Sequence, residues 1–293
     1  MLLTDVNARL TWNLVDDVRN ALAFHFMVNA FRAGTIVAIV AAGIGWFMVL
    51  RRETFAGHTL SVVGFPGAAG AVWLGLSAVW GYFAFCIAAA LVIAAIPSAT
   101  GARARGYHDE SAAIGTLQAF ALACGFLFAS LYGGFANGFN ALLFGTFLGV
   151  TDAQVVTLFV VGAAALLVVA AVARPLLFAS IDPDVAAARG VPVRLLSVAF
   201  LVVLGIAVAE ASQITGSLLV FALLVAPAAT AQVVTARPVW GLVVSITVGL
   251  AITWLGLGIA YYSTYPVGFW ITSVSFGAFV VSKVTRHVVG AAR

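Results

Sequence analysis

Long apolar stretches separated by short polar ones cover almost the whole chain. We count nine stretches that are long enough to cross the hydrocarbon core of a bilayer, which takes ~20 helical residues. They are residues 28–50, 59–77, 79–97, 111–132, 153–173, 194–211, 214–235, 239–262 and 266–284. Backbone polar groups in lipid must be satisfied within their own segment, so each span is expected to be a helix. The pattern therefore predicts an all-α, polytopic transmembrane helical bundle.

The beginning of the chain differs from this pattern. Residues 1–27 include five charged side chains, which interrupt the apolar core that a cleavable signal peptide needs. Residues 10–26 alternate apolar and polar positions, which predicts either an amphipathic helix on the membrane surface or a disordered segment. We therefore divide the chain into an N-terminal segment (1–27), a transmembrane domain (28–285) and a cytoplasmic tail (286–293).

Composition and charge support a membrane location and set an orientation. Only 8% of the 293 residues are charged, against about 25% in a typical soluble domain. The basic residues are scattered near span boundaries, which argues against nucleic-acid binding. Cytoplasmic loops retain Lys and Arg, and an outside N-terminus places eleven of the fourteen inside. These are Arg51, Arg52, Arg103, Arg105, Arg174, Arg189, Arg194, Arg237, Lys283, Arg286 and Arg293. We predict an outside N-terminus and an inside C-terminus.

Two connections have features of their own. The segment 133–150 is apolar, rich in Gly and Asn, and shorter than a span, which predicts a re-entrant or broken helix on the outer side, with an interfacial loop as the alternative. On the inner side, Asp182 can cap a short helix that Pro183 begins and Gly190 ends. Such a surface helix serves either as a linker or as a docking lever for a cytosolic partner.

Few polar side chains lie in or near the spans. His58 begins the second span, where Pro66 and Gly67 are expected to loosen the helix, and its imidazole can ligate a divalent metal. Asp109 and Glu110 at the start of the fourth span offer further ligands of the right type. The alternative is an unligated histidine at a span boundary. Glu210 is expected to be an interfacial carboxylate that water reaches.

Motifs for bond-making chemistry are absent from the sequence. It contains no GxxxxGK[ST], HExxH or GxSxG, and no GxGxxG placed to open a helix after a strand. The chain is therefore expected to be a non-enzymatic protein that binds no cofactor. If ATP drives it, a separate subunit must hydrolyse the nucleotide.

Four phrases in order resemble the permease subunit of bacterial ABC importers for zinc and manganese. GWFMVLRRETFAGHTLSVVGFPGAA (45–69) is similar to that family's basic pair and GDALSHAxxPG, and ESAAIG (110–115) to its EDxAIG. LLFGTFLGVTDAQV (142–155) resembles SYLFGxxLxVS. DPDVAAARGVPVRLL (182–196) followed by GSLLVFALLVAPAATA (216–231) is similar to DxxxAxxxGxPVR and VGxLLVxALLxxPAATA. The resemblance extends from about residue 28 to residue 285.

The resemblance implies a fold, partners and site residues. It implies alternating access in a bacterial plasma-membrane complex of two permeases, two cytosolic ATP-binding subunits and an extracellular solute-binding protein. The segment 182–190 is then the coupling helix that meets the ATPase. Its residues Asp182, Asp184, Ala186, Arg189 and Gly190 carry that contact. The implied substrate path contains His58, Ser61, Asp109 and Glu110, with Pro66, Gly67, Gly145 and Pro227 as helix breaks or gates.

The sequence departs from the family at positions that would meet a metal. His58 and Val62 stand where the family has the Asp and His of GDALSH, and Ser111 replaces the Asp of EDxAIG. Either the site is rebuilt from His58, Asp109 and Glu110, or the cargo is a chelated metal. Imidazole ligation favours zinc over manganese, so zinc is the first expectation and manganese the second. The competing functions are an ion-coupled secondary transporter or channel and a membrane scaffold that has lost transport.

Overall fold

The computed structural model describes residues 19–20, 22–96, 104–132, 145 and 147–291, with only the backbone given for 104–110, 148, 218 and 289–291. The described part is helical and contains no strand. Its elements are α2 (His25–Leu50), α3 (Thr54–Trp73), α4 (Ala78–Ala95), α5 (Ala104–Leu131), η1 (Phe147–Gly149), α7 (Asp152–Ile181), α8 (Pro183–Ala188), α9 (Val193–Val234), α10 (Pro238–Tyr261) and α11 (Val267–Ala291). The predicted all-α class is confirmed.

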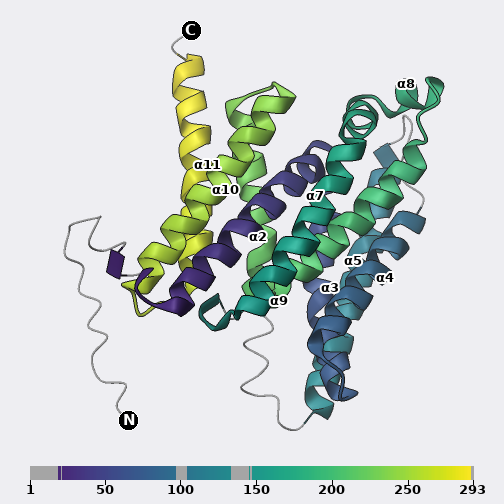
Figure 1. Ribbon diagram of the computed structural model, residues 1–293. Helices are drawn as coiled ribbons and strands as arrows, with labels where there is room; N and C mark the ends of the chain where they lie inside the picture. Colours follow the sequence, from purple (N-terminus) through teal and green to yellow (C-terminus); the bar gives the residue numbers. More distant parts are fainter. Residues whose placement is uncertain (1–18, 21, 97–103, 133–144, 146, 292–293) are drawn as a thin grey trace, which may run out of the picture.

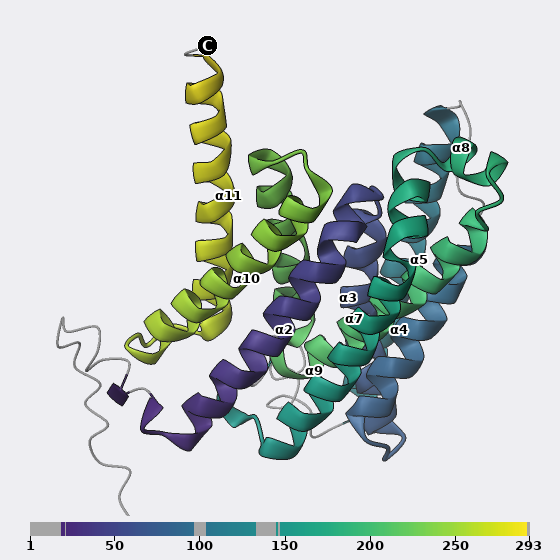
Figure 2. The same ribbon diagram turned by 45° about the horizontal axis from the view of Figure 1, so that its top comes forward.

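The helices form one bundle around α2 and α9. Figure 1 shows α10 and α11 on one side of α2, and α3, α4 and α5 on the other. The turned view in Figure 2 shows α7 beside α2 and α9. The short helix α8 and the end of α11 lie at one end of the bundle, opposite the start of α2. This arrangement agrees with an odd number of crossings.

Seven described helices are long and apolar enough to cross a membrane on their own. Helix α3, at the predicted span 59–77, is not one of them, because it is interrupted by Gly, Thr, Ser and His residues. Fifteen of its twenty residues are buried within the bundle. A helix that is covered by protein does not need an apolar surface, so α3 can carry polar groups that a lipid-facing helix cannot.

The predicted spans 194–211 and 214–235 are both halves of α9. The break lies at Gly216, whose φ of 75° is left-handed and favours glycine. Before the break Ser197 contacts Arg51, near the C-terminal end of α2, and after it Leu224 packs on Gly45 of α2. The two halves therefore run in opposite directions, and the predicted pair of spans is present with its break a few residues later than expected.

Several ends differ from the predicted boundaries. Helix α2 begins at His25 rather than at 28, α5 starts seven residues earlier than expected, and α7 extends to Ile181. Helix α11 continues to Ala291, so most of the predicted tail is a helical extension. Of the predicted amphipathic segment, residues 10–18 and 21 lie outside the described residues, and its end from His25 belongs to α2.

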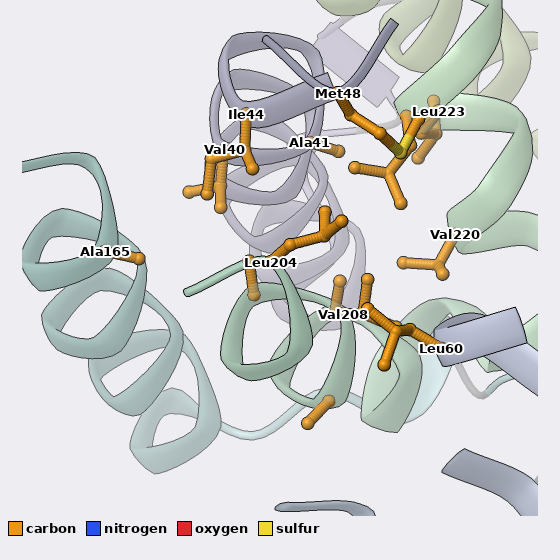
Figure 3. Close-up of a cluster of buried hydrophobic side chains, with 14 of the residues drawn as sticks. Val40, Ala41, Ile44, Met48, Leu60, Ala165, Leu204, Val208, Val220 and Leu223 are labelled. Carbon is orange, nitrogen blue, oxygen red and sulfur yellow. The ribbon is translucent and has the colours of Figure 1, made fainter. Parts of the chain in front are cut away.

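The core is formed where α2, α3, α7 and α9 meet. Figure 3 shows Ile44 and Met48 of α2 facing Leu204 and Leu223 of α9, with Leu60 of α3 beside them. All five side chains are fully buried. Since lipid supplies little hydrophobic drive for helix association, close packing of this kind holds a membrane bundle together.

Close packing is tightest where α3 crosses α4. A Cβ atom at Gly67 would overlap the carbonyl oxygen of Gly81 and lie 2.6 Å from Cβ of Phe85. Helix α3 continues through Pro66 and Gly67, so the predicted helix break at this point is wrong. Gly67 is required here for the close approach of α3 and α4 and not for a break in the helix.

We expect Gly67→Ala to destabilise the bundle by about 1–3 kcal/mol, the usual cost of overpacking. The matched control is Gly258→Ala in α10, because no atom lies within 4 Å of a Cβ atom built there. The thermal stability of the two variants in detergent is compared by measuring the loss of the monodisperse size-exclusion peak as temperature rises. Equal unfolding midpoints for both variants would contradict the packing assigned to Gly67.

Candidate functional site

The imidazole of His58 lies between α3 and the second half of α9. Its ring centroid is 4.6 Å from that of Phe221, and the side chain is half-buried. Its Nδ1 atom is buried and has no hydrogen-bond partner in the described part of the chain. A neutral imidazole with a free nitrogen is a common metal ligand. The position predicted from sequence is therefore chemically available.

Hydrogen bonds fix the helical turn that carries His58. Ser61 donates from Oγ to the carbonyl oxygen of His58 at 2.7 Å, so its hydroxyl is used within the helix. Thr59 donates from Oγ1 to Oε1 of Gln118 on α5 at 3.0 Å. Val62 is buried at 7% exposure and offers no ligand atom. The turn is thus held against α5 and α9, with His58 as its one metal-binding side chain.

The carboxylate ligands predicted beside His58 remain a prediction. The side chains of Asp109 and Glu110 lie outside the described residues, although α5 passes through both positions. Ser111 is half-buried on α5, two turns before Gln118. Among the described residues, no three His, Cys, Asp or Glu side chains are grouped closely enough to hold a metal.

Sequence reasoning missed Gln118 and Phe221 as neighbours of this turn. Gln118 is the only amide side chain in the predicted span 111–132, so an isolated polar group in an apolar helix was an available signal. Phe221 carries no such signal, because α9 is rich in apolar residues and only the folded chain shows which one covers His58.

The predicted surface helix is present as α8. Asp182 caps it by accepting a hydrogen bond from the Val185 amide at 3.0 Å, and Gly190 ends the turn with a φ of 81°. Asp184 and Arg189 are exposed, whereas Ala186 is fully buried. Val185 is 45% exposed, an apolar side chain left uncovered on this face.

The described end of the segment 133–150 packs on the break in α9. Residues 133–144 and 146 lie outside the described residues, so the predicted re-entrant helix stays a prediction. Gly145 has a φ of 78°, and a Cβ atom there would be 2.6 Å from the amide nitrogen of Gly216. The following η1 is a short 3-10 turn that buries Phe147. Phe147 and Val150 are therefore covered by the bundle, whereas Gly149 is exposed.

Two further expectations are corrected. Pro227 does not break α9, whose one non-helical residue is Gly216. Glu210 is not at a water interface, because only 5% of it is exposed. It lies in an apolar pocket that includes Val37 of α2 and Leu158 of α7, and Gln213 donates to it at 3.3 Å. The sequence placed it at a span end, but α2 and α7 cover that end.

The chain matches known membrane permeases over most of its length. The profile of the ABC 3 transport family matches residues 23–286. The manganese import system permease protein ScaB of Streptococcus parasanguinis is 32% identical over 260 residues, which cover 88% of this chain and 90% of that protein. The chelated iron transport system membrane protein YfeC of Yersinia pestis is 28% identical over 239 residues, covering 82% of this chain and 79% of that one.

A solved structure has the same fold. PsaBC from Streptococcus pneumoniae in complex with Fab superposes with a TM-score of 0.79 at 29% identity, covering 92% of this chain and 95% of that chain. The residues matched by the family profile include α3, which carries His58, and α8. By sequence and by fold, the chain is a membrane permease of the ABC 3 transport family.

Proposed function

We propose that this permease forms the membrane path of an ATP-driven importer for a divalent transition-metal ion. The observation that carries the proposal is the unpartnered Nδ1 of His58, buried in the turn that matches the family's GDALSH phrase. Relatives that are 32% and 28% identical to this chain are named for manganese import and for chelated iron transport, respectively. Manganese is thus the first cargo to test, and zinc, which imidazole ligation favours, the second.

The proposed path follows α3 between α5 and α9. His58 contributes a nitrogen ligand, and carboxylates of Asp109 and Glu110 are the remaining candidates. Alternating access then requires that the turn around His58 opens to one side of the membrane at a time. Because α3 is covered by protein along most of its length, the ion stays out of contact with lipid.

The coupling proposal concerns α8. Its exposed residues Asp184, Val185 and Arg189 would contact the cytosolic ATP-binding subunit, while buried Ala186 anchors the helix. Two copies of the permease, two such subunits and an extracellular solute-binding protein would make the complete importer. ATP is then used by the partner and not by this chain.

A chelated metal is a second candidate cargo, on a specific observation. Among the described residues His58 has no carboxylate close enough to complete a three-ligand site. A chelated ion brings its own ligands, so it would need fewer from the protein.

We expect His58→Ala to reduce ATP-dependent metal uptake about tenfold or more, the usual scale for disturbing a metal site. The assay is uptake of manganese, zinc and iron into vesicles that hold the permease, its ATPase and its binding protein. Thr247→Ala in α10 is the matched control, because the exposed hydroxyl of Thr247 bonds the carbonyl oxygen of Val243 in its own helix, away from the proposed path. It should stay within about twofold of wild type.

The outcomes of this assay separate the readings. Uptake that is unchanged in His58→Ala would contradict a role for this residue in the path. ATP turnover in wild type without uptake of any free ion would favour a chelated cargo. Uptake without an ATPase would favour an ion-coupled transporter. Absence of transport for every cargo tested would favour a scaffold.

We expect Val185→Asp to weaken binding of the ATP-binding subunit about tenfold or more, because it places an unpaired charge in the middle of the proposed contact. Val239→Asp is the matched control, since Val239 is 75% exposed in the first turn of α10. Co-purification of the ATP-binding subunit measures both. If the two variants lose the subunit equally, α8 is not the specific contact.

A further inference from the structure

A buried arginine sits at the junction between α2 and α3. The side chain of Arg51 is only 7% exposed, and it forms an ion pair with Glu53 at 2.8 Å. Its Nε also donates to the same Glu53 oxygen, at 3.1 Å. Burying a charge is costly unless it is paired and hydrogen-bonded, so the site must satisfy this guanidinium closely.

The same guanidinium reaches across to α9. Its Nη2 donates to Oγ of Ser197 at 2.6 Å, and its central carbon lies 5.3 Å from the ring centroid of Phe200. Ser197 and Phe200 belong to the first turns of α9, which begins at Val193 directly after α8. Arg51 therefore connects the α2–α3 junction to the helix that follows the proposed ATPase contact.

The junction between α2 and α3 is closely packed and has a restricted backbone conformation. Arg52 adopts a φ of 61°, which is uncommon for a residue with a side chain. Glu53 then stands as the N-cap residue of α3, and a Cβ atom at Gly57 would overlap Sδ of Met48 on α2. His58 follows Gly57 directly. Glu53, the ion-pair partner of Arg51, is thus a little more than one helical turn from His58 along α3.

Only a guanidinium can make these contacts together. It donates from two nitrogens to two partners while its flat face stacks on an aromatic ring. An ammonium group is a point charge that would keep the pairing with Glu53 but not the additional link to α9. An Arg51→Lys substitution therefore keeps the positive charge and removes the contacts with Ser197 and Phe200 of α9.

We propose that Arg51 is a positioning residue that transmits movement of α8 and the first turns of α9 to the His58 end of α3. This inference rests on the proposed function, in which α8 meets the ATPase and His58 lies on the metal path. Arg51 touches neither the nucleotide nor the ion. Its part is to make two distant sites move together.

The test compares Arg51→Lys with Arg52→Lys, the exposed arginine next to it, in the vesicles described above. Metal taken up per ATP hydrolysed should fall about tenfold in Arg51→Lys, within the usual range of coupling between sites. Arg52→Lys should keep the wild-type ratio. A ratio unchanged in Arg51→Lys, or a loss of ATP turnover in proportion to uptake, would overturn the proposal.

Ser197→Ala is a second test variant in case Arg51→Lys fails to assemble. Ser197→Ala keeps the Arg51–Glu53 ion pair and removes only the bond to α9, so it should lower uptake per ATP by about two- to threefold. An unchanged ratio in this variant would count against the link to α9.

A second readout does not depend on the cargo. Spin labels at Ala187 of α8 and Phe55 of α3, both exposed, are placed in a Cys86→Ala, Cys124→Ala chain. With the ATPase bound, their separation should stay constant on adding ATP in wild type and change in Arg51→Lys. An equal response of the label separation to ATP in both proteins would overturn the inference. Absence of metal uptake in wild-type vesicles would contradict only the proposed function, because the spin-label distances do not depend on the cargo.

Discussion

The structure depends on helices approaching one another more closely than ordinary side chains allow. Lipid is as apolar as leucine, so a membrane bundle gains its stability from packing and hydrogen bonds rather than from leaving water. Gly45 lets α2 contact the backbone of α9 at Leu224, and Gly67 lets α3 contact α4 at Gly81. These contacts enclose α3 within the protein.

Enclosure of α3 by other helices allows it to carry polar side chains. Ionisable and hydroxyl groups are costly against lipid and acceptable where protein surrounds them. His58, Thr59 and Ser61 lie on a helix of this kind, held by Gln118 of α5 and Phe221 of α9. Val62 is buried at a position where the family's phrase carries a histidine, so the proposed site would receive one imidazole from α3.

Much of the fold could be predicted from sequence, because span length and hydropathy are set by the thickness of the bilayer. Helix α8 was also predictable, since Asp182, Pro183 and Gly190 carry local signals for its ends. The sequence could not show which residues meet across helices. Burial of Glu210 by α2 and α7, the packing role of Gly67, and the contact of Arg51 with Ser197 all depend on pairs far apart in the chain.

The central claim is that His58 meets the transported metal directly. X-ray absorption spectroscopy on the assembled transporter, loaded with zinc and then with manganese and held with a non-hydrolysable ATP analogue, tests it most directly. We predict an imidazole nitrogen in the first coordination shell of zinc at about 2.0–2.1 Å, and its loss in His58→Ala. A first shell that is identical in wild type and His58→Ala would contradict the account.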